Sequence, residues 1–343
     1  MPVAPPGFVV TAYDRGSRGP RQLYLAPNKD LFVAESAKAR VMLLRDNDGD
    51  GYPDQREIFA SGLPGCFGML VLHDDFYIAA TTGVWKFPYQ AGQTRLGPGT
   101  RIAELPDGGH NTRNLAASPD GSKLYVAVGS SGNIAEQGMQ QEFHRADILE
   151  MNPDGSGLRV YASGLRNPVG LAWHNNALWT TVNERDMLGA DLPPDYFTRV
   201  REGAFYGWPY SYWGGHEDPR RAGERPDLVR AAIVPDVALG AHVAPLGFAF
   251  YNSKKFPQQY RGGAFIAEHG SWNRPEFAGY KVVYLPFAGG KPVGPPQDFL
   301  TGFIADGAKS LVHGRPVGIA VAPDGALLVS DDGGNMIWRV APR

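Results

Sequence analysis

Pairs of short apolar segments recur along the whole chain, and each pair is separated by a polar turn. In every unit a polar or glycine-containing lead-in precedes the first apolar run, and the second run ends in a small or acidic residue. Short apolar runs bounded by Gly, Pro, Asn and Asp are typical of β-strands joined by tight turns. The pattern occurs six times, at residues 21–36, 68–83, 113–130, 169–184, 246–270 and 317–334.

The spacing of these six units predicts a β-propeller. Equivalent positions in successive units lie 46 to 77 residues apart, so each unit has room for four strands and the later units contain insertions. We therefore predict an all-β fold in which residues 1–343 form one six-bladed β-propeller domain. The segment at about 205–240, rich in Trp, Tyr, Pro and Arg, is expected to be an inserted loop over one face.

The two ends of the chain predict how the ring closes. The N-terminal phrase GFVVTAYDRG has the same character as TRIAELPDG and LRVYASGLR, which precede later units as outer strands. We expect this first strand to complete the blade begun by the C-terminal GNMIWRVAPR, which removes both free sheet edges. Two separate β-domains are the alternative, but no polar linker interrupts the middle of the chain.

Composition agrees with a fold of many turns and narrows the choice of partners. The chain contains 44 Gly and 29 Pro, and its 43% hydrophobic content can fill a large core. The formal net charge of -2 gives no electrostatic reason to expect a nucleic acid or an anionic membrane as partner. Cys66 is the sole cysteine, so no disulfide can form within the chain.

We find no targeting or membrane segment in the sequence. The first residues, MPVAPPGFVV, contain no basic segment followed by an apolar one. No uninterrupted run reaches the roughly 18 apolar residues that a membrane span requires. We therefore expect a soluble chain without membrane insertion and without a signal peptide of its own.

Cationic and amide side chains are concentrated in the loops that a propeller gathers around its axis. The loops between neighbouring blades and the loops between the second and third strands of each blade lie on one face of such a ring. A cluster of cations and amides there predicts an anionic or carbonyl-rich ligand, although Arg166 and Asn167 could instead tie adjacent blades together by hydrogen bonds. The first kind of loop contains Arg21, His110, Arg166, Asn167, His242 and Arg315, and the second contains Arg40, Glu184, Arg185, His269 and Arg274.

A resemblance to a known family covers nearly the whole chain and is most specific in four motifs: GLRNPVGLAW, WTTVNERDMLGADLPPDY, GAFYGWPYSYWGG and EHGSWNR. With them the chain resembles the soluble glucose and sorbosone dehydrogenase family that depends on pyrroloquinoline quinone (PQQ), and within it the sorbosone and pyranose dehydrogenase-like branch. The resemblance implies a propeller enzyme that holds PQQ and Ca²⁺ and oxidises a sugar or sugar aldehyde by hydride transfer to the quinone. It also implies a periplasmic or secreted location. Because no haem attachment motif is present, the electrons are expected to pass to an external acceptor.

The resemblance also assigns catalytic roles. His110 matches the general base that takes the hydroxyl proton of the substrate, a role that suits a neutral imidazole. Arg166 matches the residue that holds the quinone oxygen and stabilises the negative charge that develops there. Asn167 would fix the rim of the cofactor. The alternative for His110 is a hydrogen-bonded residue of the core.

PQQ carries three carboxylates, so its site needs further cations. Arg274 and Arg315 lie in loops where the family has such residues, and Arg40 is a weaker candidate. Arginine suits a carboxylate because its planar fork donates two parallel hydrogen bonds. The alternative is that these arginines are solvated surface charges.

The resemblance places Ca²⁺ beside the quinone, where it acts as a Lewis acid. The aligned metal ligands are the backbone carbonyls of Glu184 and Arg185, but the loop departs from the family in length and composition. The Glu184 carboxylate, Asp186 and Asp195 are alternative ligands. Equally, NERD could form a salt-bridged loop without a metal.

A second calcium hypothesis comes from spacing alone. Residues 46–57, DNDGDGYPDQRE, follow the ligand spacing of a calcium-binding loop, with Gly51 at its sixth position. Pro53 and the strand-like continuation exclude an EF-hand, so the loop is either a structural Ca²⁺ site remote from the chemistry or a plain turn. The ligands would be Asp46, Asp48, Asp50, Tyr52 through its carbonyl, Asp54 and Glu57.

Two other classes of function compete with the dehydrogenase. A calcium-dependent propeller lactonase or hydrolase would hold a central metal with several acidic and amide side chains, whereas this chain offers Arg and His there. A non-catalytic binding platform would not require the set of His110 and arginines. No dinucleotide fingerprint, P-loop or nucleophile elbow is present, which argues against nucleotide and nicotinamide chemistry.

Overall fold

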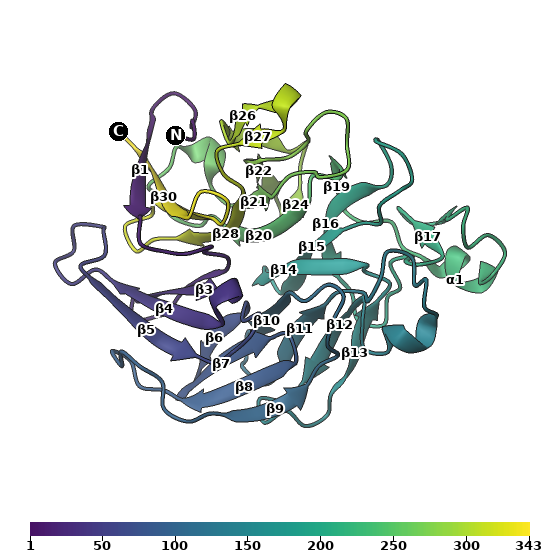
Figure 1. The fold of residues 1–343 in the computed structure, drawn as a ribbon, viewed down its shortest axis with the longest axis horizontal. Helices are drawn as coiled ribbons and strands as arrows, with labels where there is room; N and C mark the ends of the chain where they lie inside the picture. Colours follow the sequence, from purple (N-terminus) through teal and green to yellow (C-terminus); the bar gives the residue numbers. More distant parts are fainter.

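The computed structural model describes all residues from Met1 to Arg343. Twenty-four of its thirty strands build six four-stranded antiparallel sheets arranged in a ring, and the other six form three two-stranded sheets (Figure 1). The predicted six-bladed β-propeller is confirmed. In each sheet the strand that comes first in the chain is innermost, except that the last sheet takes its outer strand from the N-terminus. Blade 1 is β2 (Leu23–Leu25), β3 (Leu31–Glu35), β4 (Arg40–Arg45) and β5 (Gln55–Ser61); blade 2 is β6 (Met69–Leu72), β7 (Asp75–Ala80), β8 (Gly83–Pro88) and β9 (Thr100–Glu104); blade 3 is β10 (Arg113–Ala117), β11 (Leu124–Val128), β12 (Asp147–Met151) and β13 (Arg159–Ser163). Blade 4 is β14 (Asn167–His174), β15 (Ala177–Asn183), β16 (Pro194–Val200) and β19 (Val237–Ala241); blade 5 is β20 (Pro245–Phe250), β21 (Ala264–Glu268), β22 (Lys281–Leu285) and β25 (Gln297–Leu300); blade 6 is β28 (Pro316–Val321), β29 (Leu327–Asp331), β30 (Met336–Pro342) and β1 (Phe8–Asp14).

The core lies between neighbouring blades. The second strands are buried on both faces, and β3, β11, β21 and β29 have no exposed residue, which explains their continuous apolar sequences. Between blades 1 and 2, for example, the ring of Phe32 lies 4.4 Å from that of Phe59 and 4.8 Å from that of Phe76. Each sheet is thus stabilised by apolar contacts with the next sheet around the ring.

Glycines allow the innermost strands to approach one another closely. A Cβ atom at Gly170 would lie 2.6 Å from the backbone oxygen of Leu246 in the next blade, and one at Gly247 would lie 2.6 Å from that of Val317. A Cβ atom at Gly318 would lie 2.4 Å from the backbone oxygen of Arg21. No larger residue fits these positions without a shift of the backbone.

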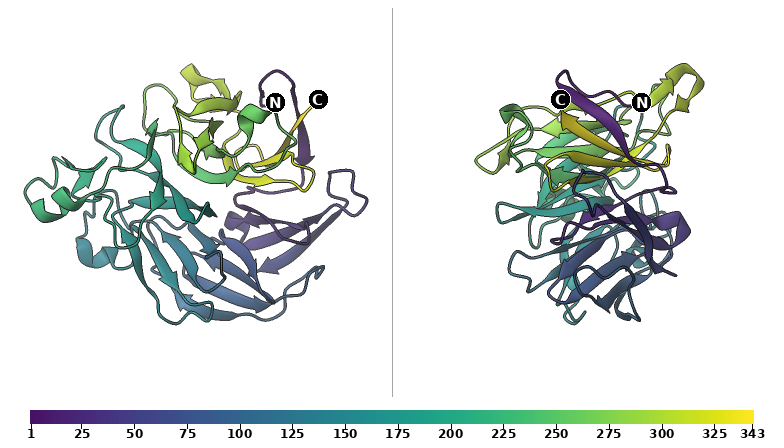
Figure 2. Two further views of the ribbon diagram at one scale, coloured as in Figure 1. Left: turned by 180° about the vertical axis from the view of Figure 1, so that it is seen from behind. Right: turned by 90° about the vertical axis from the view of Figure 1, so that its left-hand side faces the viewer.

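The N-terminal strand closes the ring, as predicted. β1 pairs with β30 in antiparallel register from Phe8 opposite Pro342 to Asp14 opposite Ile337. The two termini consequently lie side by side, which Figure 2 shows from two directions. β30 is thereby paired on both sides, and β1 is the outer strand of the blade 6 sheet.

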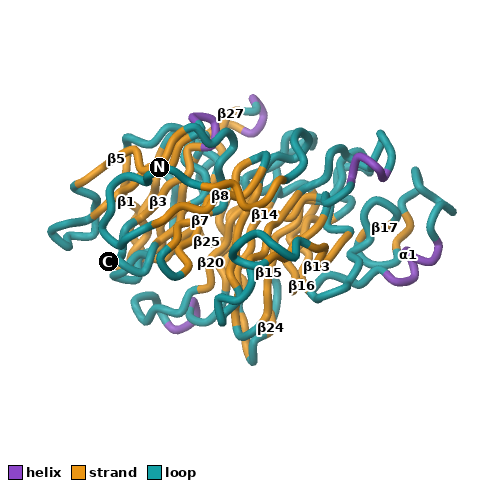
Figure 3. Tube along the Cα trace, turned by 90° about the horizontal axis from the view of Figure 1, so that it is seen from below, coloured by secondary structure: helices purple, strands orange, loops and turns teal.

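The segment between β16 and β19 projects from the side of the ring beside blades 3 and 4 (Figure 1). It contains β17 (Ser211–Tyr212), β18 (His216–Glu217) and the short helix α1 (Pro226–Ala231). Figure 3 shows β17 and α1 beyond the layer of strands rather than above its centre. The segment is fixed by backbone hydrogen bonds from Tyr206 to Ser163 and from Trp208 to Gly164.

The remaining short elements occur in connecting loops. None of the helices is long and apolar enough to span a membrane. The 3₁₀ helices are η1 (Ser36–Lys38), η2 (Met139–Glu142), η3 (Gln258–Tyr260) and η4 (Gly307–Lys309), and the remaining strands are β23 (Phe287–Ala288), β24 (Lys291–Pro292), β26 (Ile304–Asp306) and β27 (Leu311–Val312).

Candidate functional site

A polar cavity of about 330 Å³ opens at the mouth of the ring, lined by loops of blades 3 to 6. The structure brings most of the predicted cavity residues together there, although Arg21 and Arg315 lie 294 positions apart in the chain. Of its 17 lining residues only three are hydrophobic, so the cavity suits a polar ligand. Its lining includes Arg21, His110, Arg166, Asn167, Glu184, His269 and Arg315 from the predicted set.

His110, on the loop from β9 to β10, is oriented by Ser130 at the end of β11. Its Nδ1 lies 2.9 Å from the Ser130 carbonyl oxygen and 3.1 Å from the Ser130 hydroxyl. That hydroxyl donates its proton to the carbonyl of Gly132, so both Ser130 atoms accept from Nδ1–H. The Nε2 of His110 therefore carries the lone pair and can accept a proton.

The pKa of His110 is lowered to about 4, first by burial and then by the positive charge of Arg166. The imidazole is therefore neutral at neutral pH. A neutral ring with a free Nε2 is the form that a general base requires.

Arg166 is held rigidly at the start of β14. Its Nη1 donates to the carbonyl of Glu184 at 2.6 Å, and its Nη2 lies 3.1 Å from Asp186 Oδ2 and 3.0 Å from Asn133 Oδ1. Only 4% of the residue is exposed, and burial lowers the pKa of the guanidinium. The fork is therefore held by the β11–β12 and β15–β16 loops.

Asn133 connects the groups around Arg166 by hydrogen bonds, although the sequence analysis did not predict it as a site residue. Its side chain accepts from Arg166 and from the backbone N–H of Asp186, and it donates to the Asp186 carbonyl. Its own carbonyl accepts from Arg166 Nε and from the indole N–H of Trp208 at 2.8 Å. One asparagine thus links Arg166, the β15–β16 loop and the projecting segment. No sequence motif indicates this role.

The other predicted arginines take different positions. Arg315 lines the cavity and donates to the carbonyls of His269 and Gly270, so it faces the site without a carboxylate partner. Arg274 lies outside the cavity lining, where it bonds the Ala241 carbonyl and the exposed Asp191. Arg40 is not brought to the cavity, because Glu35 on the adjacent strand binds it at 2.6 Å.

Arg21 adds a cation to the site from the loop between β1 and β2. Its Nη1 donates to Asp332 Oδ2 at 2.6 Å, and the other oxygen of this carboxylate lies 2.9 Å from His269 Nε2. His242, on the β19–β20 connection, contacts the carbonyl of Gly189, and the nearby carboxylate of Asp186 raises its pKa. These contacts fix the orientation of Arg21, His242 and His269 at the cavity.

Two buried carboxyl groups stand beside Arg166. Glu184 and Asp195 both line the cavity, and burial raises the pKa of each to about 7. Asp195 accepts from the backbone N–H groups of Glu184 and Ala244. By contrast, Glu184 Oε1 and the Asn167 side-chain oxygen are buried and have no hydrogen-bond partner.

The predicted pair of metal-binding carbonyls has an unexpected environment. The Glu184 carbonyl already accepts from Arg166. The Arg185 side chain points away to form a buried ion pair with Asp218 at 2.6 Å, which ties the loop to the projecting segment. The buried side-chain oxygens of the cavity that have no hydrogen-bond partner belong to Glu184, Asn167 and Asn273.

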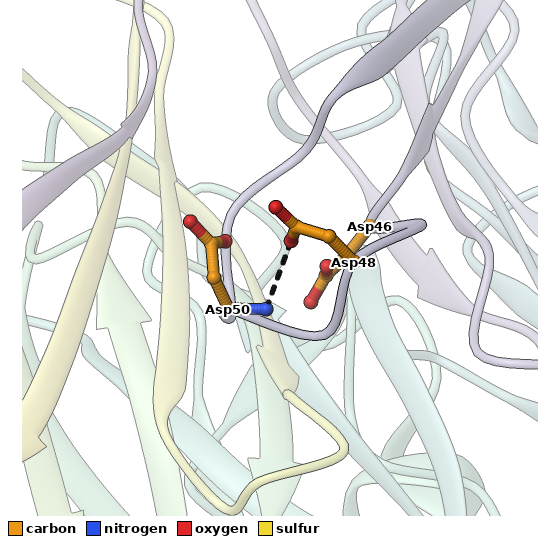
Figure 4. A group of neighbouring side chains, drawn as sticks. All are labelled: Asp46, Asp48 and Asp50. Atoms are coloured by element: carbon orange, nitrogen blue, oxygen red, sulfur yellow. Dashed lines mark hydrogen bonds between the residues drawn. The ribbon is translucent and has the colours of Figure 1, made fainter.

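The acidic loop at 46–57 lies on blade 1, and its residues do not line the cavity. Figure 4 draws its first three carboxylates, those of Asp46, Asp48 and Asp50. The carboxylates of Asp46, Asp48 and Asp50 lie within 4.8 Å of one another, whereas those of Asp54 and Glu57 do not join them. Asp54 instead accepts from the backbone of residues 47 and 48, and Glu57 is fixed on strand β5. Only part of the predicted ligand set converges, and calcium binding here stays a prediction.

Comparison with known proteins identifies relatives over nearly the whole chain. A family model described as TrAA12-like matches residues 2–194 and 228–342. The aldose sugar dehydrogenase YliI of Escherichia coli is 28% identical over 215 residues, covering 58% of this chain and 49% of that protein. The pyrroloquinoline quinone-dependent pyranose dehydrogenase of Coprinopsis cinerea is 25% identical over 327 residues, covering 82% of this chain and 44% of that protein. The resemblance drawn from the sequence motifs is confirmed at the level of the family.

The fold is shared with solved structures. The calcium structure of the Trichoderma reesei carbohydrate-active enzyme of family AA12 aligns with a TM-score of 0.86 at 20% identity, over 100% of this chain and 97% of that one. The chain spans about half the length of the two curated relatives above.

Proposed function

The chain belongs to the TrAA12-like family, and from the chemistry of its cavity we propose that it is a PQQ-dependent dehydrogenase that oxidises a sugar or sugar aldehyde. One observation carries this proposal: a neutral histidine with a free Nε2 shares a polar cavity with two arginines, Arg166 and Arg315. Arg315 lacks a carboxylate partner, so its positive charge is available to an anionic ligand.

The residues of the cavity fit the quinone. Arg166 and Arg315 would hold it, with Arg21 as a third cation, and these charges complement its carboxylates. When bound, the quinone supplies an acceptor for a hydride, a chemistry that protein side chains lack. Hydrogen bonds to carbonyls and carboxylates already orient these three arginines, which reduces the entropic cost of binding the quinone.

The cavity also fits a calcium ion. Hard cations such as Ca²⁺ bind carboxylate and amide oxygens, and the buried Glu184 Oε1 and Asn167 Oδ1 have no other partner. We expect these two side chains to act as ligands, in addition to or in place of the predicted carbonyls. The calcium-bound relative of similar fold supports this extension.

The chain itself supplies proton transfer and charge. His110 Nε2 takes the proton of the substrate hydroxyl, while Ser130 keeps the ring in the required tautomer. Arg166 presents a fixed positive charge at the place where negative charge develops, so no reorganisation is needed during the reaction. The family resemblance further supports a periplasmic or secreted location and transfer of the electrons to an external acceptor.

A dye-coupled assay tests the proposal. The purified protein is mixed with PQQ and Ca²⁺, singly and together, and dye reduction is followed with a panel of aldoses, ketoses and sorbosone. Activity that requires the quinone and is stimulated by Ca²⁺ supports the proposal. Hydrolysis of lactones without any quinone-dependent oxidation would favour the propeller hydrolases instead.

A further inference from the structure

A second pocket lies between blade 3 and the projecting segment, and the proposed function does not use it. It has a volume of about 570 Å³ and shares no lining residue with the cavity that contains His110. One of its walls comes from residues 139–147 and strand β13, and the other from residues 203–228. This volume suits a small organic molecule.

Two polar side chains of blade 3 line this pocket without a partner in the protein. Asp147, at the start of β12, lies opposite Ser163 of β13 in the antiparallel register, so both side chains are on the same face of the sheet. Asp147 is only 7% exposed, yet its carboxyl group makes no hydrogen bond or ion pair. Ser163 hydrogen-bonds through its backbone alone. Because buried polar groups normally have a partner, a ligand is expected to supply one here.

The other charged groups of the pocket already have partners. Glu142 accepts two hydrogen bonds from Ser131, and Arg145 donates to backbone carbonyls of two loops. Arg225 pairs at 2.7 Å with a carboxylate of helix α1. Burial, and then the negative charge of Glu142, raise the pKa of Asp147 well above its usual value, because no cation lies near enough to stabilise the carboxylate. A ligand that carries one positive charge would provide that stabilisation.

Aromatic rings provide much of the remaining lining. Eight of the 16 lining residues are hydrophobic, against three of 17 in the cavity, and four of the eight are Phe143, Phe205, Trp208 and Tyr210. Phe143 is 71% exposed, so its ring is available to a ligand. The faces of such rings attract cations, and the guanidinium carbon of Arg225 already lies 5.9 Å from the centre of the Tyr210 ring. The lining therefore suits a cation that also has apolar surface.

We propose that this pocket binds an organic ammonium ion, whose N–H groups donate to Asp147 and Ser163 and whose apolar part contacts the aromatic rings. One ammonium group can reach both side chains, since directly opposite residues of an antiparallel pair have their Cβ atoms about 5 Å apart. A metal ion fits poorly, because Ca²⁺ takes about six to eight oxygen ligands and these two residues offer fewer. The site is independent of the quinone, since the pocket and the cavity share no lining residue.

Calorimetry on the full chain tests the proposal, with cyclohexylamine as the ammonium probe and cyclohexanol as its neutral counterpart. The amine should bind at millimolar concentrations and the alcohol should bind more weakly. Asp147→Asn should weaken binding of the amine at least tenfold, the effect of losing a charge-assisted hydrogen bond. Asp154→Asn makes the same change of charge at the exposed turn between β12 and β13, and this control should leave the affinity unaltered.

The pH dependence gives a second readout on the natural protein. An alkylammonium ion stays charged from about pH 6 to about pH 8, and it binds the carboxylate form of Asp147. Because the pKa of Asp147 is raised, binding should release a proton and strengthen as the pH rises. Of the other titratable groups that line the pocket, Glu142, Arg145 and Arg225 have partners, and burial lowers the pKa of His144. Asp147→Asn should abolish the proton release.

A second variant changes an exposed side chain, so that its fold is not at risk. Phe143→Leu keeps an apolar side chain but removes the aromatic face, and it should weaken binding of the amine about two- to fivefold. Equal binding of cyclohexylamine and cyclohexanol would show that the pocket is merely apolar and would overturn the inference. So would an unchanged affinity in Asp147→Asn, or no binding of the amine at millimolar concentrations.

Discussion

At the scale of single residues, the site depends on side chains that fix the tautomer or the orientation of the catalytic residues. Ser130 determines which nitrogen of His110 is free, because its hydroxyl proton is committed to Gly132. Sequence motifs predicted His110, Arg166 and Asn167 but gave no sign of Ser130 or Asn133, whose roles depend on the path of one loop. Arg40 was predicted to lie at the site, but the structure does not place it there, because Glu35 on the adjacent strand binds it.

The lowered pKa of His110 predicts the pH dependence of the reaction. The imidazole must be neutral to accept a proton, and its pKa of about 4 keeps it neutral well below the ordinary histidine value of 6.5. The acid limb of kcat/KM, which reports the free enzyme, should therefore have its midpoint clearly below pH 6.5. Titration of the His110 ring by NMR in the quinone-free protein gives the pKa independently. A midpoint at or above 6.5 in both experiments would contradict the assignment.

Asn133 should act as a positioning residue. In Asn133→Ala, Arg166 and Asp186 lose their shared partner, and kcat should fall by about 10- to 100-fold, as for other residues that orient a catalytic group. The loss should appear mainly in kcat, and the midpoint of the acid limb should rise, because displacement of Arg166 weakens the positive charge that helps to lower the pKa of His110. Asn47→Ala, an exposed loop asparagine without side-chain bonds, is the control. An unchanged kcat in Asn133→Ala would show that Arg166 holds its position alone.

At the scale of elements, the sequence predicted the strands far better than the loops. The alternation of apolar runs and turns located the strands, and a glycine before or within the inner strands marked their close approach, as at Gly170 and Gly247. The projecting segment was expected over one face, but it lies at the side of the ring, because Arg185 and Asp218 dock it against the β15–β16 loop. Such a contact between distant segments has no local sequence signal.

The Arg185–Asp218 ion pair should stabilise this docking strongly. Both side chains are buried, so Asp218→Asn leaves a buried guanidinium without its counter-charge and should lower the free energy of unfolding by about 3–5 kcal/mol. Chemical denaturation measures the change. Asp298→Asn removes the exposed partner of Lys281 and should have no measurable effect. Equal stability of the two variants would mean that the projecting segment is held by other contacts.

At the scale of the whole molecule, the ring is closed by a strand from the opposite end of the chain. Residues 8–14 and 336–342 meet in one sheet, and Phe8 packs against Phe256 and Phe299 of blade 5 at 4.8 and 5.3 Å between ring centres. This closure could be predicted because both ends carry strand patterns that would otherwise be free edges. The arrangement of the loops at the mouth could not, since their lengths alone do not give their paths.

Phe8→Ala should therefore destabilise the whole ring. Phe8 is 6% exposed, and loss of such an aromatic side chain costs about 3–5 kcal/mol of unfolding free energy. The thermal transition should move down as one cooperative step, because every blade depends on its neighbours. Val9→Ala, an exposed position on the same strand, is the control. A separate early transition in Phe8→Ala would show that blade 6 opens independently of the other blades.

The central claim is that the cavity at the mouth of the ring binds PQQ and that His110 takes the proton of the sugar hydroxyl when the sugar is oxidised. The most direct test titrates quinone-free protein with PQQ in the presence of Ca²⁺ and then follows the quinone absorbance after a sugar is added. We expect saturable binding by both the natural protein and His110→Ala, with rapid reduction by sugar in the natural protein alone. Failure of the natural protein to bind the quinone, or equal reduction in His110→Ala, would contradict the account.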